Sequence, residues 1–485
     1  MPLELKDINK EKVGFFRFKK LNGEYLLTND MGGYCFLDPI EFDLFLIGKI
    51  EDRSPNKYSE LIDKGFIRDR LDFNGLTSKY ASRNMFLGSG PSLHIVVVTL
   101  RCDHKCIYCQ SGAKDLDSTQ YDMDSRTAEK VVDRIFESPN SNITIEFQGG
   151  EPLVNFDTIK FIVEYANKKN KSAKKKLLIS LVSNLTYMNK KILTFLIKNN
   201  VSFCTSLDGP EILHNKNRIV LSTNNNSYKN TIKWIKRIRG EVKKHKTYKY
   251  RLNALTTITK YSLSYPREII DEFVALGLDG IHLRPVNPFG IREKTRQKIS
   301  FSAEDFLDFY KEALDYIMVL NFKGHNFYER TAKIFLQKIL TNRDPNYLEI
   351  RSPCGAGTGQ LAYNFNGDVY TCDEGRMFSV MGDDTFRLGN VNKNKYQEFI
   401  DNEIVKILSL SSCLDGIPSC SDCVYKPYCG TCPLYNYVIE GNIFLRSPTN
   451  DRCRINMSIL DYIFELLSNP EAKAIFEKWL GIKKV

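Results

Sequence analysis

Three cysteines of this chain lie on one short stretch, at the spacing Cys102-x3-Cys106-x2-Cys109. Three thiolates on one loop can bind three irons of a cubane [4Fe–4S] cluster, which leaves the fourth iron open to a small molecule. A run of four cysteines, as in a ferredoxin, would instead saturate the cluster for electron transfer. The alternatives are a zinc loop or three unrelated thiols. Zinc requires a fourth Cys or His at comparable spacing, and His104 would point away from ligands on either side of it.

The cysteine loop follows the apolar run Leu93–Leu100, which predicts a buried parallel strand. From residue 90 onward, strand-like and helical patterns alternate. The strand-like runs are Leu93–Leu100, Asn142–Phe147, Leu177–Ser183, Val201–Leu207, Tyr250–Ile258 and Gly280–Val286. The helical stretches between them are Thr127–Glu137, Phe156–Asn167, Asn189–Lys198, Tyr228–Ile238 and Pro266–Leu276. These repeats predict an α/β fold, an open (β/α)6 partial barrel whose active face is the carboxyl end of its parallel strands.

Polar motifs follow three of these strands. Gln148-Gly149-Gly150-Glu151-Pro152 comes directly after the second strand, where glycines let the backbone approach a ligand and Glu151 supplies an anion. Ser183-Asn184 follows the third strand, and Ser206-Leu207-Asp208-Gly209-Pro210 ends the fourth. His214 and Arg218 come just beyond. These side chains can face a ligand, although Asp208, His214 and Arg218 could equally brace the turn.

The number and placement of the cysteines favour metal over disulfides. Of the 13 cysteines, three are in the first loop and most of the others lie between Cys354 and Cys453, enough for two more four-ligand clusters. Cys35 and Cys204 lie outside both groups and are expected in the core. Cys354 and Cys372 flank a predicted hairpin, Tyr363–Tyr370, which would bring their thiols together. Zinc ribbons also use C-x2-C pairs, so this end of the chain by itself leaves zinc open.

The cysteine loop, followed at this distance by Gly149-Gly150-Glu151-Pro152, resembles the signature of radical S-adenosylmethionine (SAM) enzymes. The cysteine-rich end resembles the SPASM extension of that family, which carries two auxiliary [4Fe–4S] clusters. The resemblance covers residues 12–460. Five stretches together look like one subgroup, the B-type maturase of the His-Xaa-Ser system: Leu100–Cys106, Glu146–Pro152, Ser183–Thr186, Ser206–Pro210 and Leu283–Gly290.

The resemblance implies a set of SAM contacts around the first cluster, which Cys102, Cys106 and Cys109 would hold. They are Tyr108 near the adenine, Gly149, Gly150 and Glu151 at the methionine ammonium, Ser183, Asn184 and Ser206 near the ribose, and Arg218 at the carboxylate. Leu185 stands where relatives often have glycine, a departure from the family pattern beside Asn184. Family members also line the adenine pocket with the stretch that here is His282–Val286.

The same resemblance divides the later cysteines into two ligand sets. Cys354, Cys372 and Cys432 would hold the inner auxiliary cluster, with Cys413 as its fourth ligand. If Cys413 is free, that cluster has an open iron. Cys420, Cys423, Cys429 and Cys453 would hold the outer cluster. Asp373, beside Cys372, is the candidate catalytic base, because related sulfatase maturases carry an aspartate there; alternatively it caps the hairpin.

The first part of the chain, residues 12–85, forms a separate predicted unit. Phe15–Phe18 and Tyr25–Thr28, joined through Asn22-Gly23, indicate a β-hairpin, and Tyr34–Leu37 a third strand. Helical segments over Pro39–Ile50 and Lys57–Lys64 follow. This pattern resembles a small winged-helix peptide-recognition module, in which a leader peptide adds a strand to the sheet edge. The alternative is a structural cap on the barrel.

These units give the expected domain organisation. It runs from the winged-helix-like module (12–85) through the radical SAM partial barrel (90–320) and a helical linker (321–350) to the SPASM domain (351–460) and a C-terminal helix (461–485).

Among 485 residues no run of about 18 apolar ones occurs, so no membrane span is expected. Met1–Asp7 lacks the apolar core of a signal peptide, and a cytoplasmic protein is expected. The formal charge of +11 is concentrated in two basic stretches, Lys168–Lys176 and Lys233–Arg251. Such stretches form solvated helix faces and loops, or alternatively a docking surface for an acidic peptide or RNA.

The resemblance implies an oxidoreductase that modifies a ribosomally made precursor peptide, with SAM and three [4Fe–4S] clusters as cofactors. An electron would cleave SAM at the first cluster, and the resulting radical would take a hydrogen from the peptide, leading to cross-linking or oxidation. The expected partners are the peptide, an electron donor such as flavodoxin or ferredoxin, and a second radical SAM maturase. Rival functions are a sulfatase-type maturase that forms an aldehyde residue and an RNA-modifying radical SAM enzyme. No RNA-binding module is recognisable.

Overall fold

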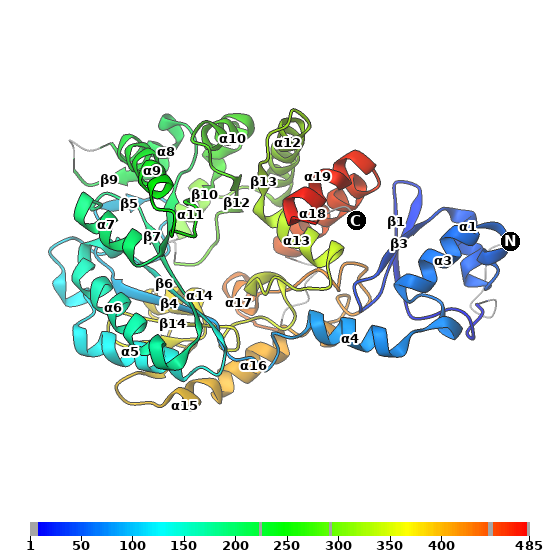
Figure 1. Cartoon of the computed structure of the whole chain (residues 1–485), viewed down its shortest axis with the longest axis horizontal. Coiled ribbons are helices and arrows are strands. Elements are labelled where there is room, and N and C mark those ends of the chain that lie inside the picture. Colours follow the sequence, from blue (N-terminus) through cyan, green and yellow to red (C-terminus); the bar gives the residue numbers. More distant parts are fainter. Residues whose placement is uncertain (1–7, 223–225, 291–292, 445–449, 483–485) are drawn as a thin grey trace.

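The computed structural model describes residues 8–222, 226–290, 293–444 and 450–482. Residues 1–7, on which the signal-peptide expectation depends, lie outside this part. The chain has three regions: an N-terminal unit, an α/β domain and a cysteine-rich end packed between them (Figure 1). None of the described helices combines the length and the apolar character that crossing a membrane requires.

The N-terminal unit is a three-stranded antiparallel sheet covered by short helices. Its strands are β1 (Arg17–Leu21), β2 (Glu24–Thr28) and β3 (Tyr34–Leu37), in the order β1-β2-β3. The predicted turn is present, with positive φ at Asn22 and Gly23. The helices are α1 (Pro39–Leu46), α2 (Ile50–Arg53), α3 (Pro55–Lys64) and α4 (Phe73–Arg83). The single helix predicted over 39–50 is wrong, because Gly48 takes a left-handed φ of 73° and separates α1 from α2.

The predicted α/β fold is confirmed. The six strands β4 (Leu93–Thr99), β6 (Asn142–Gly149), β7 (Lys176–Ser183), β8 (Val201–Ser206), β10 (Asn253–Ile258) and β12 (Leu283–Pro285) form parallel neighbours in one sheet. The intervening helices are α5 (Ser125–Glu137), α6 (Phe156–Ala173), α7 (Lys190–Lys198), α8 (Glu211–Asn217), α9 (Ser227–Lys244) and α10 (Pro266–Ala275). The strand predicted over 280–286 is interrupted at His282. Its first part, β11 (Gly280–Ile281), pairs instead with β13 (Tyr328–Glu329).

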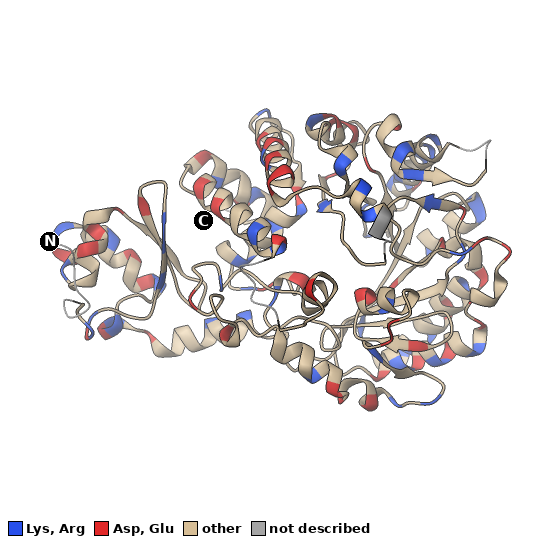
Figure 2. Cartoon of the chain, turned by 180° about the vertical axis from the view of Figure 1, so that it is seen from behind, with Lys and Arg blue, Asp and Glu red and all other residues tan. Residues whose placement is uncertain are grey.

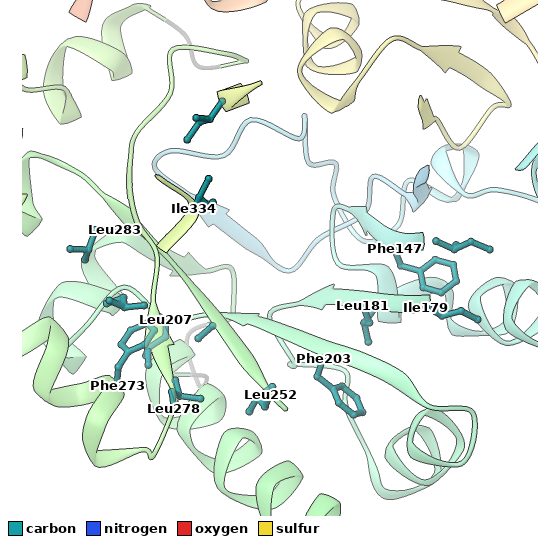
Figure 3. Close-up of a cluster of buried hydrophobic side chains, with 14 of the residues drawn as sticks. Phe147, Ile179, Leu181, Phe203, Leu207, Leu252, Phe273, Leu278, Leu283 and Ile334 are labelled. Carbon is teal, nitrogen blue, oxygen red and sulfur yellow. The ribbon is translucent and has the colours of Figure 1, made fainter. Parts of the chain in front are cut away.

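The alternation of side chains along the strands separates a core from a cavity. Figure 3 shows Phe147, Leu181 and Phe203 among a cluster of buried apolar side chains. Their strand neighbours, such as Gln148 and Val182, face the other side and line the interior of the barrel. The core therefore fixes which side chains of each strand face the site.

The cysteine-rich end continues the same sheet. The predicted hairpin is present as β14 (Gln360–Tyr363) and β15 (Asp368–Tyr370), followed by β16 (Arg387–Asn390). Strand β14 pairs in parallel with β4, with Gln360 opposite Leu93. The edge of β4 is thus covered, and the hairpin is anchored beside the strand that leads into the first cysteine loop.

Helices complete the molecule after the barrel strands. They are α11 (Glu293–Ile299), α12 (Ala303–Phe322), α13 (Arg330–Leu340), α14 (Asp373–Val380), α15 (Tyr396–Ile400), α16 (Glu403–Ser411), α17 (Pro433–Glu440), α18 (Asp451–Leu467) and α19 (Pro470–Leu480). The segment 321–350 is not purely helical, since it includes β13. A single helix over 461–485 is wrong as well: α18 ends at Leu467, Pro470 starts α19, and the Asn469 side chain accepts hydrogen bonds from the Glu471 and Ala472 amides.

Candidate functional site

A cavity of about 680 Å³ lies between the barrel strands and the cysteine-rich end. Its wall contains most of the predicted site residues: Cys102, Cys106, Tyr108, Cys109, Gly149, Gly150, Ser183, Asn184, Ser206, Arg218, Cys354, Cys372, Asp373 and Cys432. Cys204, expected in the core, also lies in this wall. Glu151, Cys413, Cys420, Cys423, Cys429 and Cys453 are not part of it.

The first cysteine loop is held by a short antiparallel ladder. Strand β5 (His104–Cys106) pairs with β9 (Arg218–Val220), so that Cys106 lies opposite Arg218. Burial raises the pKa of the Cys106 thiol to about 12, although the Arg218 guanidinium opposes this effect. Buried thiols with raised pKa values ionise only when a cation binds them, so this loop suits a metal cluster better than a reactive free thiol.

The spacing of the thiols tests which metal group fits. Within the described ranges, the only Cys, His, Asp or Glu group with all ligand atoms inside 4.8 Å is Cys102, Asp103 and His104. Tetrahedral zinc holds its sulfurs roughly 3.8 Å apart, given a Zn–S bond of about 2.3 Å. Both ring nitrogens of His104 are already engaged, with Asp103 Oδ1 at 2.8 Å and Ser227 Oγ at 2.9 Å. No three cysteines in the described ranges have all their sulfur atoms within 4.8 Å of one another.

Tyr108 and Arg218 belong to one buried hydrogen-bond chain. The Tyr108 hydroxyl donates to Asp208 Oδ2 at 2.6 Å and accepts from Arg218 Nη1 at 2.6 Å. Asp208 also accepts from Asn217 Nδ2 at 3.3 Å. His214 is buried, with Nε2 2.9 Å from Ser227 Oγ. Asp208 and His214 thus brace the turn, and they fix the two side chains that do reach the cavity.

Glu151 lies behind the cavity wall. Its Oε1 accepts from the Leu153 amide at 3.0 Å and from Ser183 Oγ at 2.7 Å, and its Oε2 accepts from the Asn184 amide at 2.8 Å. Burial raises the pKa of Glu151 to about 7. Glu151 therefore positions Ser183 and Asn184, and its predicted contact with the methionine ammonium stays a prediction. The next residue, Leu185, has a φ of 65°, which explains why glycine is common there.

The two glycines of the same motif are required by close packing. A Cβ on Gly149 would lie 2.4 Å from the Thr99 carbonyl oxygen, and one on Gly150 would lie 2.3 Å from that of Arg101. The motif backbone therefore rests directly against the start of the cysteine loop. This contact sets the distance between the loop and the carboxyl end of β6.

The opposite wall of the cavity holds three further cysteines. Cys354, Cys372 and Cys432 are all buried and belong to one apolar cluster. Cys413 is not part of the cavity wall: its Sγ lies 3.9 Å from Asp415 Oδ2, and the hydroxyl of the neighbouring Ser412 accepts a hydrogen bond from the Cys354 amide at 2.8 Å. Three of the four predicted inner ligands thus line one cavity wall, and the role of Cys413 as the fourth stays a prediction.

The remaining cysteines lie on the other side of the cysteine-rich end. Cys429 Sγ accepts from Asn456 Nδ2 at 3.8 Å, and Cys453 Sγ lies 3.7 Å from Met457 Sδ. Burial, followed by the charges of Cys423 and Cys453, raises the pKa of Cys429 to about 12. Burial, followed by Cys420 and Cys423, raises that of Cys453 to about 11. The role of Cys420, Cys423, Cys429 and Cys453 as the outer ligand set stays a prediction.

Asp373 begins α14 and forms a buried ion pair. Its Oδ1 lies 2.8 Å from Nε of Arg376, whose side chain is fully buried. Arg376 Nη1 donates to the Ser111 carbonyl at 3.4 Å, and Nη2 lacks a partner among the described residues. Asp373 therefore lines the cavity, and the buried Arg376 guanidinium compensates its negative charge.

A second charged group in the wall was not predicted from the sequence. Glu349 Oε1 lies 3.1 Å from Arg284 Nη2, and its Oε2 accepts from Arg452. Glu374 Oε1 lies 3.7 Å from the same Arg284 nitrogen. Burial disfavours the charge of Glu349, but the Arg452 and Arg284 guanidiniums hold its pKa at about 2. Arg284 belongs to the stretch His282–Val286 named above, but Glu349, Glu374 and Arg452 belong to no motif, so no spacing could have identified the group.

Comparisons with known proteins agree with this geometry. Residues 96–260 match the model of the radical SAM superfamily. The chain is 26% identical over 331 residues to a cysteine-type anaerobic sulfatase-maturating enzyme of Clostridium perfringens, covering 65% of this chain and 82% of that enzyme. The structure of native anSMEcpe with bound AdoMet has a TM-score of 0.65 at 22% identity, over 79% of this chain and all (100%) of that one.

A second solved structure covers a larger share of the chain. Streptococcus suis SuiB, bound to its precursor peptide SuiA, has a TM-score of 0.53 at 16% identity and covers 90% of this chain and 98% of its own. The part of the α/β domain that matches the radical SAM model therefore lies within an overall fold like those of anSMEcpe and SuiB.

Proposed function

We propose that this chain is a radical SAM enzyme that modifies a ribosomally made precursor peptide, by cross-linking or oxidising its side chains. The observation that carries the proposal is the single cavity between two cysteine sets, Cys102/Cys106/Cys109 and Cys354/Cys372/Cys432. A substrate held there would touch both. When bound, the first cluster and SAM supply a radical able to take hydrogen from an unactivated carbon.

The residues of the chain have separate tasks in this proposal. The Arg218–Tyr108–Asp208 hydrogen bonds fix the side chains beside the first cysteine set, and Glu151 fixes Ser183 and Asn184. Asp373, on the opposite wall, would accept the proton that the substrate loses. The inner and outer cysteine sets would hold auxiliary clusters that accept the accompanying electron, giving three clusters in all.

The N-terminal unit would recognise the peptide. Its edge strands are β1 and β3, either of which can accept an added strand. The unit is also joined to the outer cysteine loop: Thr28 Oγ1 donates to the Val424 carbonyl at 2.6 Å, and Tyr428 hydroxyl donates to the Gly32 carbonyl at 3.2 Å. A peptide bound at the unit would therefore start beside the cysteine-rich end. These contacts also mean that deleting the unit would expose buried groups.

Mass spectrometry of a peptide co-expressed with the enzyme tests the function. The probe is a short precursor peptide encoded beside the gene, with and without a neighbouring second radical SAM maturase. We expect the peptide to lose two hydrogens, and to be unchanged with the Cys102→Ala, Cys106→Ala, Cys109→Ala variant. The likeness to the sulfatase-maturating enzyme favours one rival, formation of an aldehyde residue. Conversion of a Cys- or Ser-bearing sulfatase peptide, with no change in the precursor peptide, would establish that rival instead.

A further inference from the structure

The outer face of the β5–β9 ladder presents exposed apolar side chains directly behind the first cysteine set. In the register of the ladder, Lys105 lies opposite Ile219, while Cys106 lies opposite Arg218. Neighbouring residues of a strand point to opposite faces. Cys106 and Arg218 line the cavity, so Lys105 and Ile219 point outward. Only the thickness of this ladder separates the outer surface from the Cys106 thiol.

Two aliphatic side chains are exposed on this surface. Ile219 is 48% exposed, and Leu221, the residue that follows the end of β9, is 43% exposed. Leu221 is fixed there because its amide donates to the Asp103 carbonyl at 2.9 Å. Lys105 is 67% exposed and makes only a loose pair, 3.7 Å, with the equally exposed Asp115. Contiguous exposed apolar side chains with a charged rim are typical of protein docking sites.

The charge around this surface is strongly positive. Helix α9, which packs on α8 next to the ladder, carries seven Lys or Arg residues and one acidic residue, Glu241. Lys216, on the helix that leads into β9, is exposed beside the Tyr261 ring. Figure 2 shows Lys and Arg along the helices and strands at this end of the molecule, far from the N-terminal unit. A positive surface draws in an acidic partner and speeds its association.

We propose that Lys105, Ile219 and Leu221, flanked by the basic helix α9, form the docking surface for a small acidic protein that carries one electron at a time. The proposal rests on the proposed function, which places a cluster at Cys102, Cys106 and Cys109 and requires an electron there. An electron carrier needs a short path and only a small, weakly held interface. This surface offers both, since it lies one residue from a cluster ligand and outside the substrate cavity.

Reduction of the reconstituted protein by reduced flavodoxin tests the docking surface. In stopped-flow experiments that follow the iron–sulfur absorbance, Ile219→Glu and Lys216→Glu should each slow reduction about tenfold, because steering of an acidic partner is lost. Dithionite, which needs no docking surface, should reduce all variants at the wild-type rate. Calorimetry with oxidised flavodoxin should show the same loss of binding without any turnover. The matched control is Val319→Glu, on α12, at a side chain that is 43% exposed.

Three outcomes decide the matter. Unchanged flavodoxin rates in both ladder variants, at wild-type iron content, would overturn the docking surface. An equal slowing in Val319→Glu would overturn it too, because the effect would then be one of net charge alone. If dithionite itself fails to reduce a cluster at the first cysteine set, the proposed function falls, and the docking surface falls with it.

Discussion

Replacing Asp373 by asparagine should lower peptide modification on the order of 10²-fold, the low end of what a general base contributes. After hydrogen is taken from the substrate, a stable product forms only if a proton and an electron also leave. Asp373 lies in the cavity wall one residue from Cys372, so its carboxylate can take the proton where the inner cysteine set would take the electron. Asparagine keeps the size and one acceptor but removes the base. Iron content and SAM cleavage without substrate should stay near wild type.

The ion pair with Arg376 provides the control. Arg376→Gln breaks the pair yet leaves the Asp373 carboxylate in the cavity. If Asp373 is the base, modified peptide per unit of iron-loaded protein should fall far less in Arg376→Gln than in Asp373→Asn. Equal losses of iron and product in both variants would show that the pair only supports the fold of this wall. Full modification by Asp373→Asn would show that another group accepts the proton.

Replacing Glu349 by alanine should lower the free energy of unfolding by about 3–5 kcal/mol, the usual cost of leaving a buried charge without its partner. Its carboxylate joins Arg284, at the end of β12, to Arg452, in the first turn of α18. Removing it takes away the carboxylate that Arg452 pairs with and leaves Arg284 with only the more distant Glu374, at 3.7 Å. Urea unfolding measures the change, and Glu241→Ala, which breaks an exposed pair with Lys244, should leave the stability unchanged.

The pH dependence of this difference follows from the lowered pKa of Glu349, about 2. A carboxylate with a lowered pKa contributes stability that is present above its unfolded pKa, about 4.3, and lost only as the pH falls towards 2. The gap between wild type and Glu349→Ala should therefore be the same at pH 6 and pH 8. A variant as stable as wild type at both values would contradict a role for this network in joining the barrel to the cysteine-rich end.

The parts of the structure that the sequence could predict are those with a local pattern. Strands such as β4 and β7 are apolar runs of the right length, and helices such as α5 alternate with them at regular spacing. Most of the motifs lie at the carboxyl ends of parallel strands. That topology alone brings Gly149, Ser183 and Ser206 into one cavity wall.

The rest depends on contacts between distant residues. Nothing local shows that β14 pairs with β4, because both are short apolar strands that could pair elsewhere. The charged residues around Glu349 are far apart in the sequence, and no regular spacing relates them. The sequence identified Glu151 as a site residue but could not show which groups donate hydrogen bonds to its carboxylate. In the structure the donors are the Ser183 hydroxyl and the Asn184 amide, at the end of the next strand. Strand pairing and the choice among possible hydrogen-bond partners are determined by the packing of the whole fold.

Iron counting after anaerobic reconstitution tests the central claim, that this chain holds three clusters in three cysteine sets. Wild-type protein should bind about twelve irons per chain, four for each cluster. The Cys102→Ala, Cys106→Ala, Cys109→Ala variant should bind about eight and should not cleave SAM. A wild-type protein that binds only about four irons, or that binds zinc at its C-terminal cysteines, would contradict the account.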